Sequence, residues 1–299
     1  MDERAPNPRP ARRFRVVVLD IDGTLLDPSD VVRPTVHQAI LSCRMLGVEV
    51  ALATGRRLRT TLPIVEQLGL PLPLVLYNGA LVWDTAHEAS LVERPLARRD
   101  LERTLEEAER EGLGALVLRG PASGERLVLV GAPLAQLPEF ERQLLPRSGE
   151  VDRLPAADVV HLDDVLTVDL FGPERELRRA TARLARAGLP IYHHGPFEWL
   201  PELPRWVANV HAPGVSKASG VDFLVRRLGL ELADVLAVGD GENDLPLLRR
   251  AGLGVAMGNA PEHVRAQAGA VVRGHDEDGV VEALERFVLE PWRQASALA

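Results

Sequence analysis

The sequence has almost no lysine, a single cysteine and no long apolar run, and these shortages limit what the protein can be. Lys217 is the only lysine among 35 basic residues; the other 34 are arginines. With Cys43 alone, the chain forms no internal disulfide and has no thiol pair for a zinc ribbon or a redox site. No apolar run approaches the roughly 20 residues that a membrane span needs. We therefore expect a cytoplasmic protein and ask whether chemistry at Lys217 requires an amine.

The charge balance excludes a second class. The 299 residues include 43 acidic against 35 basic residues, which gives a net charge of −8. A dedicated nucleic-acid binder would present a basic face to neutralise phosphates, so we expect no nucleic-acid partner. Residues 1–13, rich in arginine and proline, have no apolar stretch after their charges, so we expect a disordered lead-in rather than a signal peptide.

What the sequence does contain is an alternation of buried strands and helices. Val16–Leu19 is a short β-branched run, typical of a strand covered on both faces of a parallel sheet. Apolar residues at helical spacing follow from Pro34, and Cys43 belongs to that buried stripe. A strand over 48–53, a helix over 58–68 and a strand over 72–77 complete the order. This order predicts an α/β fold with a mainly parallel, doubly wound, Rossmann-like sheet.

The same texture returns near the end of the chain, but the middle differs. Helices are predicted from Ser216, over 243–250 and over 279–289, with strands at 235–238, 253–256 and 270–272. Between the two halves, amphipathic helices over 97–111 and 173–187 alternate with strands that look half exposed, such as 126–130 and 165–171. We therefore predict a core made of residues 14–83 and 211–299, interrupted by an inserted α+β domain over 84–210.

Polar residues follow the predicted core strands at the ends where parallel strands share one crevice. They are Asp20 and Asp22 after the first strand, Thr54, Gly55 and Arg56 after the second, and Asp240, Asn243 and Asp244 after the strand ending at Val238; Lys217 opens the preceding helix. This set of carboxylates, a hydroxyl, an amide and one ammonium suits a hard cation and an oxyanion.

A phosphate ester held with Mg²⁺ fits this set best. Magnesium prefers one or two carboxylates plus phosphate oxygens and water, and Asp20 with Asp240 can supply them. Lys217 would offset the remaining acids. Asp20 can attack phosphorus as a carboxylate nucleophile, while Asp22 can pass a proton to the leaving oxygen.

The segment after the second strand is a candidate anion site. Thr54 and the backbone N–H groups around Gly55 lie at a helix start, where phosphate oxygens bind. Arg56 is unfavourable for the helix dipole in that first turn, which leaves either an anionic partner or ordinary solvation open for it.

These segments resemble the four ordered motifs of the haloacid dehalogenase (HAD) superfamily. The motifs are Asp20-Ile-Asp-Gly-Thr-Leu25, Ala53-Thr-Gly-Arg56, Lys217 and Gly239-Asp-Gly-Glu-Asn-Asp244. Asn78-Gly79 and Ala256-Met-Gly-Asn-Ala260 are similar to marks of its Cof-type phosphatase branch, and the insertion matches that branch's type IIB cap. The resemblance covers about residues 14–289 and is thin in the cap. One departure is His211, where relatives often carry an acid.

The resemblance implies a role for each matching residue. It makes Asp20 the nucleophile and a Mg²⁺ ligand, and Asp22 a general acid/base that also ligates metal through its carbonyl. Lys217 would bridge nucleophile and phosphate, and Thr54 and Gly55 would bind the phosphoryl group. The remaining matches would have Asp240 ligate the metal, Asn243 touch phosphate or Lys217, and Asp244 support the metal shell.

Simpler interpretations compete at several positions. A calcium-binding hand starting at Asp20 or Asp240 lacks the required Gly and Glu, so it is excluded. Neighbouring side chains on a strand point to opposite faces, so we expect His193 and His194 to be exposed or packed rather than a metal pair. Burial is the expected role of Trp199 and Trp206, with sugar stacking as the alternative. The arginines 175, 178, 179, 183 and 186 are expected to form a solvated helix face.

We therefore expect a Mg²⁺-dependent phosphatase that hydrolyses a small phosphorylated metabolite, sugar phosphates first, through an aspartyl-phosphate on Asp20. A phosphomutase of the same fold is the rival enzyme. A metal-free dehalogenase is disfavoured, because Asp240 and Asp244 would have no cation to serve. A non-catalytic phosphometabolite sensor is the rival of another class, although binding alone would need neither Asp20 nor Asp22. The protein is expected to be a monomer or a homodimer.

Overall fold

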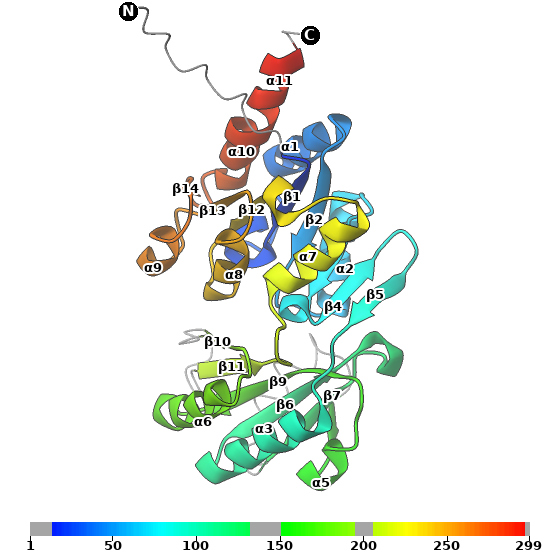
Figure 1. Ribbon diagram of the computed structural model, residues 1–299, viewed down its shortest axis with the longest axis vertical. Coiled ribbons are helices and arrows are strands. Elements are labelled where there is room, and N and C mark those ends of the chain that lie inside the picture. The colour runs from blue at the N-terminus through cyan, green and yellow to red at the C-terminus, as the bar shows by residue number, and fades with distance from the viewer. Residues whose placement is uncertain (1–13, 132–150, 195–205, 297–299) are drawn as a thin grey trace, which may run out of the picture.

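The computed structural model describes residues 14–131, 151–194 and 206–296, so the predicted lead-in lies outside the described residues. These residues form an eight-stranded and a six-stranded sheet that lie one beyond the other along the long axis of the molecule (Figure 1). Within the described ranges, no helix combines the length and apolar character that crossing a bilayer requires.

The first sheet contains the predicted core strands. Its order is β14 (Ala270–Val271), β13 (Leu253–Ala256), β12 (Val235–Gly239), β1 (Val16–Leu19), β2 (Glu49–Ala53), β3 (Leu74–Leu76), β4 (Leu81–Asp84) and β5 (Ala89–Glu93). All neighbours pair in parallel except β3–β4 and β4–β5. The predicted mainly parallel sheet is confirmed, with an antiparallel hairpin at one edge.

Helices cover both faces of this sheet because its strands are apolar on both sides. Val17 and Leu19 of β1 join the apolar cluster that includes α1 (Pro34–Met45), α2 (Leu58–Leu68) and α10 (Gly279–Leu284). Val16 and Val18, pointing the other way, join the cluster with α7 (Lys217–Arg227) and α8 (Leu245–Leu248). Cys43 is fully buried in the first cluster, as predicted. The sheet is therefore doubly wound (Figure 1).

Short helices complete the core around the first sheet. They are η1 (Ile21–Leu25), η2 (Tyr77–Gly79), η5 (Leu232–Asp234), η6 (Glu242–Asp244), α9 (Glu262–Arg265), η7 (Glu285–Leu289) and α11 (Glu290–Ser296).

The second sheet is built from the middle of the chain. Its order is β10 (Ile191–His194), β11 (Trp206–Val210), β9 (Val165–Gly172), β6 (Gly114–Arg119), β7 (Leu127–Val130) and β8 (Val151–Arg153). Its neighbours pair antiparallel except β7 and β8. Two helices, α3 (Arg98–Glu111) and α6 (Glu174–Arg186), lie along it; η3 (Pro121–Ser123) and α5 (Ala156–Val159) are short. The predicted α+β character of the insertion is confirmed.

The predicted half exposure of two of these strands is wrong. All four residues of β7 are buried, and so are seven of the eight in β9. Leu127–Val130 has no polar residue in alternate positions, so neither face of this strand suits water. All of β7 joins the same large apolar cluster as the helices α3 and α6.

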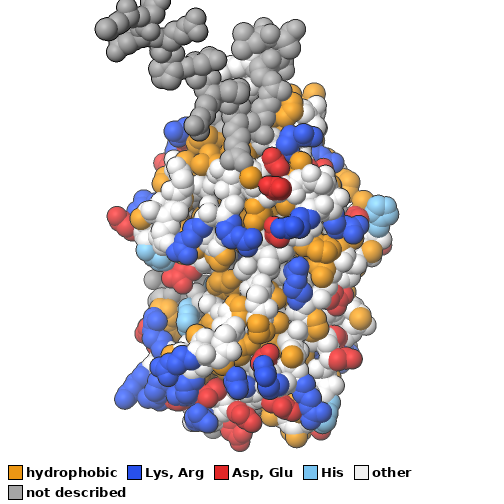
Figure 2. All heavy atoms as spheres, in the orientation of Figure 1, with side chains coloured by type: hydrophobic (Ala, Val, Ile, Leu, Met, Phe, Trp, Pro, Cys, Tyr) orange, Lys and Arg blue, Asp and Glu red, His pale blue; other side chains and the backbone are white. Residues whose placement is uncertain are grey.

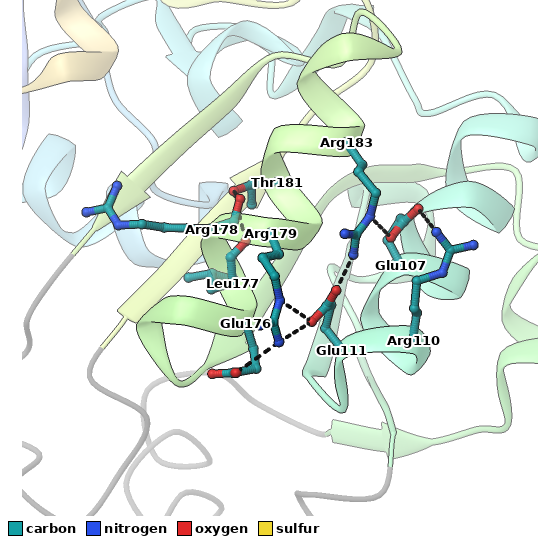
Figure 3. Close-up of polar contacts among 9 residues, drawn as sticks. All are labelled: Glu107, Arg110, Glu111, Glu176, Leu177, Arg178, Arg179, Thr181 and Arg183. Atoms are coloured by element: carbon teal, nitrogen blue, oxygen red, sulfur yellow. Dashed lines mark hydrogen bonds and ion pairs between the residues drawn. The ribbon is translucent and has the colours of Figure 1, made fainter.

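The arginines of α6 are mostly exposed, as predicted, but two of them also hold α6 to α3 (Figure 3). Arg183 donates from Nε to Glu107 at 2.6 Å and also pairs with Glu111. Arg179 donates to Glu111 at 2.8 Å. Each such half-exposed pair contributes little by itself, typically below about 1 kcal/mol, so their main effect is to fix how the helices lie together.

The predicted joint between the two regions, at residues 83 and 84, falls inside β4. The β4–β5 hairpin continues the first sheet as far as Glu93, and only then does the chain pass to α3 and the second sheet. Periodicity identifies a strand but does not say which sheet an antiparallel edge strand joins, which explains the difference of about ten residues.

Candidate active site

The acidic residues of the candidate site meet because β1 and β12 are parallel neighbours. Leu19 of β1 pairs with Val238 of β12, so Asp20 and Asp240 leave the sheet at the same edge. One carboxylate oxygen from each of Asp20, Asp240 and Asp244 lies within 4.8 Å of the others. This arrangement concentrates negative charge at a single point.

Lys217 lies in the middle of this cluster and is fully buried. Its Nζ is 2.8 Å from Asp20 Oδ1 and 2.7 Å from Asp244 Oδ1. Ser216 caps the N-terminus of α7 by accepting a hydrogen bond from the Ser219 backbone, which fixes where the helix begins and thus where Lys217 points. Burial disfavours the ammonium, but the two carboxylates more than offset it and raise the pKa of Lys217.

Asp244 orders the loop that carries Asp240. Its Oδ2 accepts the backbone N–H of Asp240 at 3.1 Å and that of Gly241 at 2.8 Å, while its Oδ1 faces Lys217. Both oxygens therefore have donors, which suits a residue that supports a metal shell and orients the lysine.

Burial raises the pKa of Asp20 well above its ordinary value, and the charge of Asp244 adds to the effect. The same two causes raise the pKa of Asp240 to about 6. Positive charge that lowers these values would stabilise the site, and an all-oxygen set of this kind suits a hard divalent cation. The chemistry of the residues present therefore fits a metal.

This concentration of acid is local. Acidic and basic side chains are interspersed over the face of the molecule in Figure 2, with apolar side chains between them. The charge of the site is consequently a property of a few loops and not of a uniformly acidic surface.

Asp22 is not one of the three clustered acids and pairs with an arginine instead. Arg56 donates from Nε to Asp22 Oδ2 at 2.7 Å, and its Nη2 contacts the other carboxylate oxygen. The Asp22 side chain is 55% exposed, so this pair lies at the open side of the site. The charge of Arg56 is therefore neutralised by Asp22 in this structure, although both residues line the same pocket.

The predicted anion site at the start of α2 is only partly available. The N–H groups of Leu58 and Arg59 donate to the Glu125 carboxylate, at 2.8 and 2.6 Å. Glu125 belongs to the inserted region, between β6 and β7 of the second sheet. The Thr54 hydroxyl accepts the Arg56 N–H at 3.1 Å. What faces the pocket is thus the loop from Thr54 to Arg56 and not the helix terminus itself.

Two asparagine amides and a histidine form a hydrogen-bonded chain beside this loop. Asn243 donates to Asn78 Oδ1 at 2.9 Å, and the Asn78 amide lies 3.1 Å from His211 Nε2. A side chain at Gly55 would approach the Asn78 amide to 3.2 Å, so the glycine lets the loop lie against it. His211, the departure noted in the sequence, is buried, and burial lowers its pKa to about 3.

Most of the predicted site residues line a pocket of about 500 Å³ between the two sheets. Its lining comprises Asp20, Asp22, Thr54, Gly55, Arg56, Asp240, Gly241 and Asn243 from the core with the first sheet, and His194 and Asn209 from the second sheet. Lys217 and Asp244 are buried behind this lining.

His194 and Asn209 are the residues that sequence reasoning missed. His194 donates from Nε2 to Asn209 Oδ1 at 2.5 Å, and Asn209 donates to Asp169 Oδ1 at 2.6 Å. Burial raises the pKa of Asp169 to about 7. The only signal in the sequence was the His193-His194 pair. The two histidines have separate partners, since His193 bonds Thr181 on α6 at 3.0 Å, and His194 in addition lines the pocket.

The tryptophans considered as sugar-stacking candidates, Trp199 and Trp206, are not part of the described pocket lining. Trp199 lies outside the described residues. Trp206, at the start of β11, packs under the Arg178 guanidinium, 5.2 Å from its ring centre.

A doubly wound core, with an acidic site at its strand ends and an inserted α+β domain facing it, defines a class of enzymes with a capped α/β core. The sequence matches the model of the haloacid dehalogenase-like hydrolase family over residues 17–125 and 200–284. The chain belongs to that family, which confirms both the resemblance and the predicted fold class.

Curated relatives match over nearly the whole length. The chain is 28% identical to the 5-amino-6-(5-phospho-D-ribitylamino)uracil phosphatase YcsE of Bacillus subtilis, covering 92% of this chain and 96% of that protein. It is also 28% identical to the phosphoglycolate phosphatase of Methanopyrus kandleri, covering 92% and 97%. Family and relatives together identify an enzyme of the phosphatase class.

Solved structures show the same fold. The chain superposes on the subclass IIB sugar phosphatase BT4131 with a TM-score of 0.75 at 22% identity, covering 91% of this chain and 98% of that one. For the phosphatase BT1666 of Bacteroides thetaiotaomicron, the TM-score is 0.76 at 22% identity, covering 94% and 97%.

Proposed function

We propose that the protein hydrolyses a small phosphorylated metabolite, sugar phosphates first, with Mg²⁺ and through an aspartyl-phosphate on Asp20. The observation that carries the proposal is the Lys217 ammonium, buried within 2.8 Å of Asp20 at the base of a polar pocket. A compact ammonium can contact both a carboxylate and a transferring phosphoryl group, whereas a planar guanidinium would fit poorly there.

Asp20 and Asp240 would hold the cation, with the Asp22 carbonyl as a further ligand and Asp244 supporting the shell. When bound, Mg²⁺ supplies positive charge to phosphate oxygens and to the acids around it. The rest of the chemistry belongs to the side chains of the chain itself.

In the first step, a carboxylate oxygen of Asp20 forms a bond to phosphorus and the bond from phosphorus to the ester oxygen breaks. Asp22 gives its proton to that leaving oxygen. In the second step, water attacks phosphorus, Asp22 takes a proton from the water, and the bond to Asp20 breaks to release phosphate. Asp22 pairs with Arg56 in this structure, so the pair must loosen when Asp22 carries a proton.

Thr54, Gly55 and Asn243 would contact the phosphoryl oxygens, together with Lys217. Arg56, already at the pocket's open side, would approach the same oxygens once released from Asp22. Excluding water from such a site strengthens each of these charge interactions.

The second sheet would act as the cap that chooses the substrate. Among the described residues of the second sheet, His194 of β10 and Asn209 of β11 line the pocket, so these two would contact the leaving group. The names of YcsE and BT4131 associate relatives with a phosphoribityl compound and a sugar, which supports polyhydroxylated substrates here. We propose residues 94–210 as the cap, a cytoplasmic location, and a monomer or homodimer.

A phosphate-release assay over a panel of sugar phosphates and one aryl phosphate, with Mg²⁺ or with a chelator, tests the proposal. We expect release with Mg²⁺ and little with the chelator. An isomerised sugar phosphate without free phosphate would identify a phosphomutase instead. Tight binding of panel members without turnover would identify a sensor.

A further inference from the structure

Glu125 is a buried carboxylate that the proposed reaction does not use. It lies just before β7 of the second sheet and is only 6% exposed, yet its partners belong to the core that contains the first sheet. Its carboxylate accepts the backbone N–H groups of Leu58 and Arg59 and the hydroxyl of Tyr77. Its own carbonyl accepts a hydrogen bond from Arg57 Nη1 at 3.2 Å.

The backbone on both sides of this contact adopts costly conformations. Glu125 has φ of +54° and Tyr77 has φ of +48°, a region that residues with a side chain rarely adopt. Tyr77 is fully buried, and burial, followed by the charge of Glu125, raises the pKa of its hydroxyl. The tyrosine therefore stays a proton donor to Glu125. Such strain persists only where surrounding contacts determine it.

The contact also lies next to the candidate phosphate loop. Arg57, which precedes α2, has a non-helical backbone, and the three residues before it are Thr54, Gly55 and Arg56. None of the first-turn residues of α2 is acidic, and its N-cap side chain makes no capping bond, so Glu125 supplies the missing cap from the other sheet.

We infer that Glu125 is a positioning residue, which caps α2 across the interface between the two sheets and thereby holds the Thr54–Arg56 loop in place. The inference rests on the proposed function for its kinetic consequence, because that loop is where we place the phosphoryl group. Its structural consequence, an ordered start of α2, does not depend on that function.

The test compares Glu125→Gln with Glu174→Gln. Both changes exchange one carboxylate for an amide in the region that forms the second sheet. Glu174, however, is half exposed and pairs only with Arg178 of its own helix among the described residues. For Glu125→Gln we expect the KM for an aryl phosphate and the inhibition constant of inorganic phosphate to rise about five- to tenfold, the size of a lost helix cap. Glu174→Gln should leave both unchanged.

Backbone hydrogen exchange gives the readout that is independent of catalysis. Amides at residues 54–61 should exchange faster in Glu125→Gln, while those of α6 keep the wild-type rate. Tyr77→Phe, which removes one donor to Glu125 and leaves both helix N–H contacts, should shift both measurements in the same direction by a smaller factor.

A lower melting temperature with unchanged KM, phosphate inhibition and exchange at residues 54–61 would overturn the inference, because Glu125 would then be structural only. If Glu125→Gln does not fold, the same criteria apply to Tyr77→Phe. A wild-type protein that releases no phosphate would contradict the proposed function, whereas exchange at residues 54–61 would still decide the role of Glu125.

Discussion

The two sheets line one pocket with different chemistry. The first sheet contributes charged groups, with Asp20, Asp240 and Asp244 gathered around Lys217. The second contributes an imidazole and an amide, His194 and Asn209, hydrogen-bonded in a row to a carboxyl whose pKa is raised to about 7. Full charges thus lie where a phosphoryl group would react, and weaker dipoles lie where the remainder of a substrate would sit.

This difference suggests a division of labour. A buried charge is costly unless it is paired, so a site with three acids and one lysine requires a further cation to balance its excess negative charge. Uncharged donors and acceptors make no such demand, and they can be exchanged to suit a new ligand without unbalancing the site. We therefore propose that the first sheet sets the reaction and the second sets which substrate is recognised.

The largest expected effect comes from removing the nucleophile. Asp20→Asn keeps the shape and the contact to Lys217 but cannot attack phosphorus, so we expect Mg²⁺-dependent release of phosphate from an aryl phosphate to fall by about 10³-fold or more. Circular dichroism should show an unchanged fold. Turnover within tenfold of wild type would contradict the assignment of Asp20.

Removing the lysine should be nearly as severe. Lys217→Ala leaves two buried carboxylates without their cation, and we expect kcat to fall by about 10²-fold and the affinity for inorganic phosphate to weaken even at saturating Mg²⁺. Titrating Mg²⁺ in both proteins separates this loss from a loss of metal. A silent substitution would refute the bridging role.

The second sheet should instead reveal itself in stability and its pH dependence. The Asp169 carboxyl keeps its proton to about pH 7 in the folded chain, against an ordinary value of 3.8. The folded state therefore binds the extra proton between these values, so wild-type stability falls as pH rises from about 4 to 7 and stays low above.

Asp169→Asn removes that proton and can still accept from Asn209. As the pH rises from 5 to 8, we expect the free energy of unfolding of the variant to increase by about 2 kcal/mol relative to that of wild type. This lies within the ceiling of about 1.4 kcal/mol per pKa unit. Urea denaturation at both pH values measures it. Equal differences at the two pH values would show that Asp169 is ionised throughout.

The smallest effect should be the most selective. Asn209→Ala breaks the link between His194 and Asp169, so we expect the KM for a preferred sugar phosphate to rise about tenfold, the cost of about one hydrogen bond to a polar group. The KM for an aryl phosphate, which offers no hydroxyls, should stay the same. Parallel losses on both substrates would mean that Asn209 serves the reaction and not recognition.

The residues of the first sheet could be predicted from the sequence better than those of the second. Each motif of the first sheet comes directly after a strand, and parallel strands deliver their ends to one edge, so Asp20, Thr54 and Asp240 could be brought together without a structure. In the second sheet, Asn209 lies opposite Asp169 because β11 and β9 pair in one particular antiparallel register. A shift by one residue would turn Asn209 to the other face, and no spacing in the sequence specifies that register.

Contacts between the sheets were equally out of reach. Glu125 and Leu58 are 67 positions apart, and the helix start looked open to an anion because its cap comes from a distant segment. Likewise, the edge hairpin β4–β5 looked like the beginning of the insertion until its pairing with β3 was known.

The burial of Lys217 has a practical consequence for labelling chemistry. It is the only lysine in the chain and it is 0% exposed, so the folded protein presents no side-chain amine to an acylating reagent. Cys43, also 0% exposed and with a pKa raised to about 12 by burial, is equally inert towards thiol reagents. Acylation of Lys217 would therefore report directly, and without background from other lysines, each time the innermost part of the site opens to solvent.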